Sequence, residues 1–493
     1  MLHLRRLYIL MILLLPGWAP PSSEIATKGI PLVRDGKKNY RKGIENEVAG
    51  RPDSAFLYFS NALVAFEKES EWDLYSKTCF KLASIKKNAR DLRNARAFLR
   101  KSDSIRQKFN IRNDSLEAEV YHLKGLLKLM DGQPGIALED FEQSIRLKKI
   151  LFGENDTLLA PTYNNMGIIF FNKPDYEEAL RYYQLAMNSA RGKKANPNPL
   201  IPRFTENIGL IYARKGDYNQ AMEYFSDALN QKIRISGQNS PDVAISFLNI
   251  ANLEIDLSNY NIALDYLIKA EKIYIANFGN DYPDLDVVYQ NMGKVYNSRS
   301  DYEKALNYYN KAIQLLKKKN PNHPRIPELN MNIGYILFVR EEYDKALGYY
   351  HRSISPDRLS QLNIKVYRNL ARCHQRLNHA DSALFYYRQS IQISDAMAPG
   401  GYEKASGLLY FGEFLQSVGR TNEAEKNIRE ATRMMETLLG RKNRDLADCY
   451  LKLGDLYINT NRPSDALSYF HRAVVALTPG YDEKDIQDRK SVV

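Results

Sequence analysis

One short residue frame recurs along this chain of 493 residues, and the recurrence limits what the chain can fold into. The frame is clearest in residues 162–187, which read TYNNMGIIFFNKPDYEEALRYYQLAM. Counted from Gly167 as position zero, Ala179 lies at +12, Tyr183 at +16 and Ala186 at +19. Small residues at zero and +12 let two helices approach closely, while larger residues fill the space beside them. The frame therefore predicts an αα-hairpin.

The frame fits the chain eleven times in one register. Its zero positions are Gly43, Ala83, Gly125, Gly167, Gly209, Ala251, Gly293, Gly334, Ala371, Gly412 and Gly454. The +12 residue is Ala in every copy, and the usual distance between zero positions is 42 residues, as from Gly167 to Gly209. A fixed period in this range indicates a solenoid, in which each helical pair covers the apolar face of its neighbour. We therefore expect stacked helical pairs over residues 36–476.

Aromatic pairs recur in the second helix of the frame, as in Tyr182 and Tyr183. They occupy positions +15 and +16, where a tyrosine ring can pack inside while its hydroxyl group reaches the surface. We expect the ring at +16 to fill the hairpin interface. The ring at +15 is expected at the junction with a neighbouring repeat.

The linkers between the helical pairs share a Gly, a polar turn, and then Pro or an apolar residue, as in 153–167, 237–251 and 279–293. Gly favours the end of one helix, and Pro fits the first turn of the next. Frame and linkers together resemble the tetratricopeptide repeat, in the long form found in kinesin light chains and in large bacterial repeat proteins. The usual repeat has about 34 residues. The resemblance implies an all-α fold, a right-handed superhelix of about eleven helix-turn-helix repeats that binds a protein or peptide.

Residues 1–20 have the pattern of a secretion signal, because Arg5 and Arg6 precede the apolar run 7–15 and Pro16 follows it. The run is too short to cross a bilayer, which takes about 20 apolar residues. We expect a signal peptide or an uncleaved signal anchor, then a linker at 21–35. The protein is then exported, and is periplasmic or attached to the inner membrane. The alternative is a wrongly assigned start or a buried apolar terminus.

Residues 477–487 break the repeat period and predict an exit loop, and residues 488–493 (DRKSVV) match a translated sequencing adapter. We therefore expect the natural protein to continue beyond residue 487. The exit segment resembles the junction in bacterial proteins whose repeat arrays precede a CHAT domain, a caspase-like peptidase module. This resemblance implies that the array is a recognition or regulatory arm. The alternative is the sensor region of a membrane histidine kinase or of a transcriptional regulator.

An asparagine lies two residues before the zero position in six consecutive repeats. These residues are Asn165, Asn207, Asn249, Asn291, Asn332 and Asn369. An amide both donates and accepts hydrogen bonds, so such a row can bind the backbone of an extended peptide on the concave surface that the resemblance implies. Neighbours that could tune specificity are Asn164, Phe171, Arg214, Asn252, Lys294, Arg368 and Arg372. Alternatively, the amides bond to the adjacent repeat and hold the pitch of the superhelix.

Basic residues concentrate between positions 77 and 108, where eleven Lys or Arg face only Asp91 and Asp103. The centre of this basic patch is Lys86, Lys87, Arg90, Arg93, Arg96 and Arg100. The patch could dock an acidic protein or, with the N-terminal segment, touch anionic lipid heads. Alternatively, it is a solvated face that keeps this end of the array soluble. Nucleic acid is not expected, because no base-reading motif accompanies the charge.

No catalytic, cofactor or metal motif is recognisable. The histidines are scattered, and His374 and His379, five residues apart at a helix end, are not expected to share a face as metal ligands would. Phosphate-binding loops and nucleophile elbows are also missing from the sequence. We therefore expect a binding module without enzyme activity or cofactor. Cys79, Cys373 and Cys449 lie in well-separated repeats, which predicts free, buried thiols and no disulfide.

Overall fold

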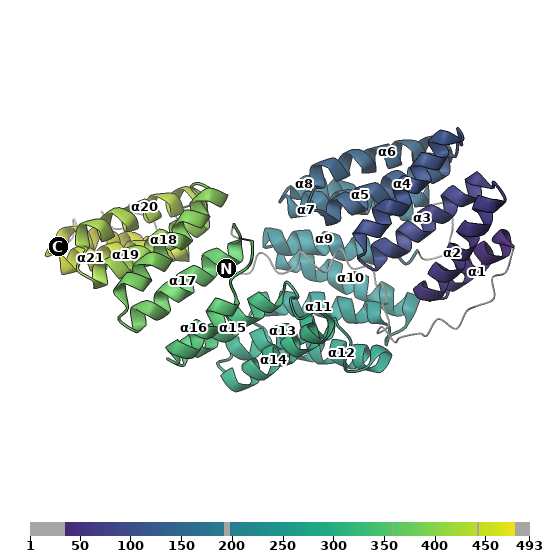
Figure 1. Ribbon diagram of the computed structural model, residues 1–493. Coiled ribbons are helices and arrows are strands. Elements are labelled where there is room, and N and C mark those ends of the chain that lie inside the picture. The colour runs from purple at the N-terminus through teal and green to yellow at the C-terminus, as the bar shows by residue number, and fades with distance from the viewer. Residues whose placement is uncertain (1–34, 192–197, 358, 441–442, 479–493) are drawn as a thin grey trace. The chain divides into compact units, whose positions relative to one another are not determined.

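The fold is all-helical, as predicted. The computed structural model describes residues 35–191, 198–357, 359–440 and 443–478, and over these it contains twenty-two α-helices, one short 3-10 helix (η1, Thr157–Leu159) and no strand (Figure 1). The predicted signal segment at 1–20, nearly all of the linker at 21–35, most of the exit loop at 477–487 and the tail at 488–493 lie outside the described residues. No helix within the described part is both long and apolar enough to cross a membrane.

The helices alternate between first and second members of a hairpin. The first helices are α1 (Gly36–Val48), α3 (Trp72–Asn88), α5 (Asp114–Met130), α7 (Ala160–Asn172), α9 (Ile201–Lys215), α11 (Pro241–Asp256), α13 (Leu285–Ser298), α15 (Ile326–Val339), α17 (Gln361–Arg376), α19 (Tyr402–Ser417) and α21 (Arg444–Asn459). The second helices are α2 (Pro52–Lys68), α4 (Leu92–Lys108), α6 (Pro134–Phe152), α8 (Tyr176–Arg191), α10 (Tyr218–Ser236), α12 (Tyr260–Phe278), α14 (Tyr302–Lys319), α16 (Tyr343–Arg352), α18 (Ala380–Met397), α20 (Thr421–Leu439) and α22 (Pro463–Leu477). Eleven hairpins result, one for each copy of the frame.

The small residues of the frame lie where the two helices of a hairpin meet. All eleven alanines at +12 are fully buried, with 0% of their surface exposed. The ring at +16 packs against the zero position, and in four repeats this ring is Tyr183, Tyr309, Tyr350 or Tyr387, each at most 1% exposed. The expected role of the +16 ring is therefore confirmed.

The ring at +15 was expected at the junction with a neighbouring repeat. That expectation was incomplete, because the ring also packs inside its own hairpin. Tyr182 stacks on Phe170, which is the +3 residue of its own hairpin, with 5.3 Å between ring centroids and 9° between ring planes. Tyr224 stacks on Tyr212 in the same way, at 5.3 Å and 9°. The +15 ring of the second helix therefore packs against the +3 ring of the first helix in the same hairpin.

Gly residues end the helices at the linkers as predicted. Gly153 follows α6 with φ of 91°, and Gly237 follows α10 with φ of 82°. These left-handed backbone conformations are strained for residues that carry a Cβ. Aspartates start several second helices, for example Asp217, whose carboxylate accepts from the backbone N–H of Gln220 at 3.1 Å.

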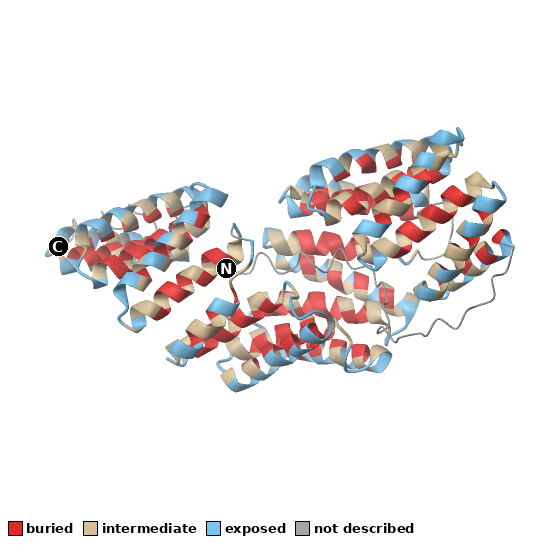
Figure 2. Cartoon of the chain, in the orientation of Figure 1, coloured by how far each residue is buried: buried red, intermediate tan, exposed pale blue. Residues whose placement is uncertain are grey.

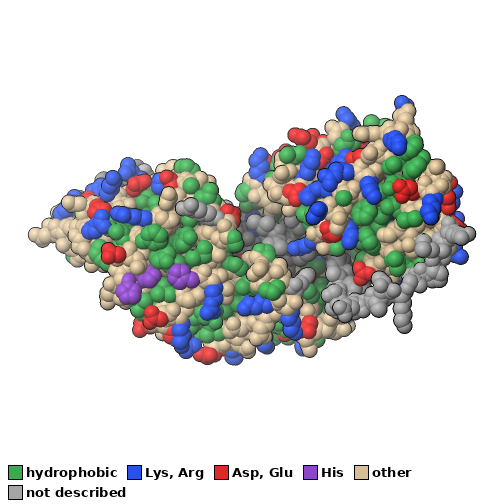
Figure 3. All heavy atoms as spheres, in the orientation of Figure 1, with side chains coloured by type: hydrophobic (Ala, Val, Ile, Leu, Met, Phe, Trp, Pro, Cys, Tyr) green, Lys and Arg blue, Asp and Glu red, His purple; other side chains and the backbone are tan. Residues whose placement is uncertain are grey.

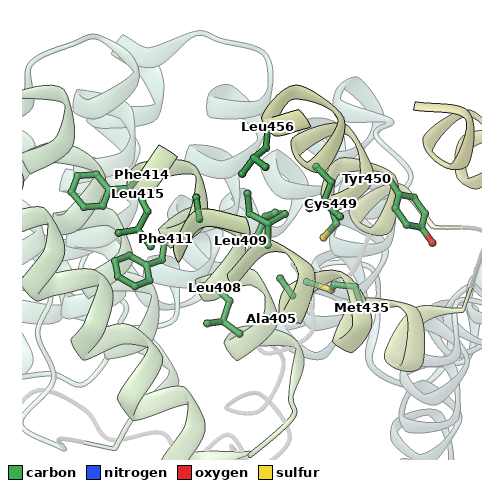
Figure 4. Packing of buried hydrophobic residues seen from close by; sticks show 14 of the residues in the cluster. Ala405, Leu408, Leu409, Phe411, Phe414, Leu415, Met435, Cys449, Tyr450 and Leu456 are labelled. Atoms are coloured by element: carbon green, nitrogen blue, oxygen red, sulfur yellow. The ribbon is translucent and has the colours of Figure 1, made fainter. Parts of the chain in front are cut away.

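The chain forms two compact units, residues 1–273 and 274–493, with the boundary inside α12. Buried residues run in stripes along the helices of each unit (Figure 2). One hydrophobic core of the second unit extends from α17 to α22, and in it Phe414, Met435 and Leu456 are each at most 2% exposed (Figure 4). Because each core is built between consecutive hairpins, stability propagates from neighbour to neighbour, as in other solenoids.

Candidate binding surface

First helices form the closest-packed layer in each unit. In the first unit α3 contacts α5 although α4 lies between them in sequence, and in the second unit α15 contacts α17, α17 contacts α19, and α19 contacts α21. Direct contact between alternate helices requires a tighter spacing than the second helices have. This places the first helices on the inner side of each stack. In the second unit, where α15, α17, α19 and α21 contact one another in turn, their remaining exposed residues line one continuous surface.

The asparagine row lies on this layer, but its members differ in burial. Asn207, Asn249 and Asn291 are 5%, 5% and 3% exposed. The half-buried members are Asn165, Asn332 and Asn369. Within the described residues, no atom accepts from the amide nitrogen of Asn291. The row therefore contains both enclosed and accessible amides.

One member of the row braces two repeats. Asn207 in α9 donates to the side-chain oxygen of Asn164 in α7 at 2.8 Å, and both side chains are buried. Asn164 was predicted as a specificity neighbour, and here its amide oxygen is already bonded. At this pair the bracing arrangement is present.

A buried charge pair holds three helices together beneath the same layer. Lys232 of α10 donates to Glu206 of α9 at 2.6 Å, and their side chains are 8% and 5% exposed. Ser246 of α11 donates to the other oxygen of the same carboxylate. Such a pair adds little net stability but is costly to break, because one charge is then left buried alone. It therefore fixes the register of these helices.

Two predicted specificity neighbours in the second unit converge on one tyrosine. The guanidinium groups of Arg368 and Arg372 each lie 5.5 Å from the ring centroid of Tyr410, and that of Arg372 lies 4.7 Å from the ring of Phe338. Arg368 also donates to Glu403 at 3.2 Å. Glu403 is shared between Arg368 and Lys365, the latter at 3.9 Å, while Arg372 forms no ion pair within the described residues. The cluster therefore presents excess positive charge against aromatic faces.

The two arginines and the tyrosine on which they converge lie on α17 and α19. A pocket of about 290 Å³ lies between α19 and the next first helix, α21. It is lined by Glu413, Gln416, Lys452, Asp455, Ile458 and Asn459. Lys452 donates to Glu413 at 2.9 Å. Burial opposes the charge of Lys452, but this bond and the nearby carboxylates of Asp448 and Asp455 raise its pKa overall. The pocket therefore holds a fixed cation beside carboxylates and amides.

Sequence reasoning missed Tyr410, Glu413 and Lys452. Tyr410 and Lys452 occupy the same −2 position as the asparagine row, in the tenth and eleventh repeats. The replacement of Asn by Tyr410 and Lys452 at this position was the sequence signal that could have identified them.

The other predicted neighbours are dispersed. Phe171 is 4% exposed, and the guanidinium group of Arg214 lies 5.8 Å from its ring centroid. Asn252 and Lys294 are half-buried on α11 and α13. Two pairs of these neighbours meet in the described part of the chain: Arg368 and Arg372 at Tyr410, and Phe171 with Arg214.

The basic patch lies on α3, on α4 and on the turn between them, in a region where Figure 3 shows many Lys and Arg side chains. Lys86 pairs with Asp91 at 3.6 Å, and Arg96 pairs with Asp131. Lys87 is half-buried, and burial lowers its pKa. The exposed members that form no ion pair in the described part of the chain are Arg90, Arg93 and Arg100.

All three cysteines are free and buried, as predicted. One expectation about the histidines was wrong: His374 and His379 do meet, with their Nδ1 atoms 3.4 Å apart. The turn between α17 and α18 reverses the chain and brings the two rings together. Across the described ranges, no group of three or more His, Cys, Asp or Glu is placed to hold a metal ion.

A family model described as tetratricopeptide repeat matches residues 116–192, 200–276, 243–318 and 403–475, which is more than half of the chain. The chain belongs to the tetratricopeptide repeat family. A second model of the same description matches residues 364–396. The tetratricopeptide assignment agrees with the eleven hairpins and their small residues at zero and +12.

Curated relatives match only part of this tetratricopeptide array. Photosystem I assembly protein Ycf3 of Prochlorococcus marinus (strain NATL1A) is 33% identical over 92 residues, covering 19% of this chain and 50% of that protein. Ycf3 of Synechococcus sp. (strain CC9605) is 32% identical over 103 residues, covering 21% and 53%. The chain spans about half the length of the curated relatives it matches.

Solved structures similar to the chain include BtubC from P. vanneervenii, with a TM-score of 0.36 and 18% identity over 48% of this chain and 87% of that one. PilF of Pseudomonas aeruginosa has a TM-score of 0.35 and 17% identity, over 50% of this chain and 95% of that one.

Proposed function

We propose that this chain is a protein-binding scaffold, and that the first-helix surface of its second unit holds an extended segment of a partner protein. The observation that carries the proposal is the convergence of Arg368 and Arg372 on Tyr410, one helix away from the pocket around Lys452. Consecutive first helices thus offer cations, amides and aromatic faces along one surface. An extended peptide can meet such groups with its carbonyl oxygens, acidic side chains and apolar side chains.

The half-buried Asn369 lies on the same surface, on α17 next to Arg368. Its amide can donate to a peptide carbonyl and accept from a peptide N–H group. Main-chain bonds of this kind supply affinity, while Arg372 and the pocket supply selectivity. The scaffold needs no catalytic chemistry or cofactor of its own for this role.

The test starts with peptides selected from a random library on the whole chain. Their affinity is then measured for Arg372→Ala and Tyr410→Ala, with Arg388→Ala as the matched control, because Arg388 is an exposed arginine on the second helix α18. We expect weaker binding for the first two variants, by about tenfold or 1.4 kcal/mol each, with an unchanged thermal midpoint in Arg372→Ala. Unchanged binding in both, or an equal loss in Arg388→Ala, would remove the proposal.

The context that we propose is an exported protein in which this array is the recognition or regulatory arm, as in CHAT-type proteins. The basic head and apolar run of residues 1–20 support export. Fusing residues 1–35 to a phosphatase that is active only outside the cytoplasm tests it. An inactive fusion would contradict export.

The sensor-region alternative differs in what would follow the repeat array in the natural gene. A single apolar run of about 20 residues would favour the sensor, and an α/β region with separated His and Cys would favour the peptidase-like module.

The exposed arginines of the basic patch make it a second contact surface in this proposal, directed at an anionic membrane. Sedimentation with vesicles that contain anionic lipid should fall when Arg90, Arg93 and Arg100 are replaced by Gln, and should fall with added salt. Equal sedimentation of the variant would leave the patch as a solvated face.

A further inference from the structure

Two histidines of the ninth repeat lie side by side at the end of the hairpin. His374 belongs to α17, and His379 lies immediately before α18. Their Nδ1 atoms are 3.4 Å apart, and their ring centroids are 5.7 Å apart. Figure 3 shows histidine side chains gathered on one face of the second unit.

Both histidines replace residues of another kind at their positions in the repeat. His374 occupies +3, which is Phe170, Tyr212 and Tyr296 in three other repeats. His379 occupies +8, which is Asp175, Asp217 and Asp301 in those same repeats. The hairpin would form with an aromatic residue and an Asp, as it does elsewhere in this chain. Folding alone therefore does not require an imidazole at either position.

The distance between the two nitrogens distinguishes two interpretations. An N–H donor bonds at about 2.7–3.2 Å, so 3.4 Å is long for a hydrogen bond between two imidazoles. Two nitrogens that each lie about 2.0–2.1 Å from one tetrahedral metal ion are separated by about 3.3–3.4 Å. The observed separation matches the distance between two ligands of one ion.

The orientation of the first ring is fixed in advance. His374 stacks on Tyr386 of α18, with 5.4 Å between ring centroids and 5° between ring planes. His351 meets the edge of the same tyrosine, at 6.2 Å and 65°. Because its ring is already held by this stack, His374 loses little freedom when it binds a ligand.

We propose that His374 and His379 form a two-histidine site for a divalent transition-metal ion, with water completing the coordination. Imidazole is a common ligand for Cu²⁺, Ni²⁺ and Zn²⁺, and Cu²⁺ binds such a site most strongly. Burial and the neighbouring His379 and His351 lower the pKa of His374. The third histidine, His351, is not a ligand in this arrangement.

The test uses the untagged whole chain and Cu²⁺ as the probe. The variants are His374→Tyr and His379→Asn, which restore residues that other repeats carry at these positions (Tyr212 and Asn259). Each should weaken Cu²⁺ binding by at least about tenfold, since only one of the two imidazoles then remains. The number of coordinated nitrogens seen by electron paramagnetic resonance should drop from two to one.

His351→Ala and His471→Ala are the controls, and both should keep the affinity and the two coordinated nitrogens. Circular dichroism checks that all variants stay helical. Unchanged Cu²⁺ affinity in His374→Tyr and His379→Asn would overturn the proposal. A loss in the controls equal to that in the two variants would overturn it as well.

Discussion

The ring of Tyr183 fills the space that a Cβ atom on Gly167 would need. Such a Cβ would lie 2.6 Å from Cε1 of Tyr183, well inside van der Waals contact. The same relationship joins Gly125 to Phe141 at 2.6 Å, and it recurs in other hairpins. Glycine at zero therefore sets how closely the +16 ring approaches the first helix.

The chain also contains the opposite combination. Where position zero is Ala83 or Ala251, the +16 residue is Leu99 or Leu267. A smaller side chain opposite makes room for the extra methyl group. The ninth repeat is an exception, because it pairs Ala with Tyr.

Gly167→Ala should therefore destabilise the fourth hairpin. Overpacking costs about 1–3 kcal/mol, and the better helix propensity of Ala returns about 1 kcal/mol. We expect a net loss of stability of up to about 2 kcal/mol, measured by the urea midpoint of the helical signal.

The double variant Gly167→Ala/Tyr183→Leu tests whether the clash with the Tyr183 ring causes the loss. It reproduces the pairing of Ala83 with Leu99. It should recover most of the loss. A Gly167→Ala chain as stable as the natural one would show that the ring moves aside freely.

Asn207→Ala should lower stability because it leaves the buried side-chain oxygen of Asn164 without its donor. An unmatched buried acceptor costs about 1–3 kcal/mol. Asn165→Ala is the control, since Asn165 is half-buried and has no bracing bond within the described residues.

Thermal midpoints and affinity for a selected peptide are measured on the same samples. Weaker peptide binding at an unchanged midpoint in Asn207→Ala would contradict the bracing account at this position. Asn249→Ala and Asn291→Ala extend the comparison along the row.

Acid should destabilise the first unit through His122. Burial, with the charges of Lys148 and Lys87, lowers the pKa of His122 to about 3, and its Nδ1 lies 2.9 Å from the hydroxyl oxygen of Thr162. The folded chain then binds fewer protons than the unfolded chain, whose histidine pKa is about 6.5. The stability contribution is present above pH about 6.5 and is lost as pH falls, by at most about 1.4 kcal/mol per pH unit.

Unfolding midpoints measured at about pH 7 and about pH 5, above and below the unfolded histidine pKa of about 6.5, check this expectation. His122→Asn is the matched variant, because Asn164 occupies the same −3 position one repeat later. Its midpoint should change less with pH. An identical pH dependence in both chains would contradict the role of His122.

The three thiols should resist modification while the chain is folded. Cys79, Cys373 and Cys449 are 0% exposed, and burial raises the pKa of each to about 12. The reactive thiolate is therefore almost absent at neutral pH. A chromogenic disulfide reagent should label none of them quickly in buffer and all three in denaturant. Rapid labelling of the native chain would show that a core opens locally.

The hairpins could be predicted from sequence because their determinants are local. Gly167, Ala179 and Tyr183 lie within one repeat, and the geometry of two packed helices dictates which of them meet. The bond between Asn164 and Asn207 depends instead on the angle between successive repeats, which the frame does not specify. The sequence therefore placed the asparagines on the right layer but did not show which amides were already bonded.

The cluster around Tyr410 was missed for a related reason. A row defined by Asn alone ended at Asn369, although Tyr410 and Lys452 continue the same position. His374 and His379 were expected at a helix end and not on one face, and this was wrong because the sequence does not show how the turn orients the two rings. The chain leaves α17 and turns before α18, and this turn brings the two rings together.

The most direct test of the binding account is hydrogen–deuterium exchange of the whole chain with and without a selected peptide. Bound peptide should slow exchange in the first helices α17, α19 and α21, and should leave the second helices α18 and α20 unchanged. Slower exchange confined to α18 and α20, or no change in any of the five helices at saturating peptide, would contradict the claim that the first-helix surface binds the partner.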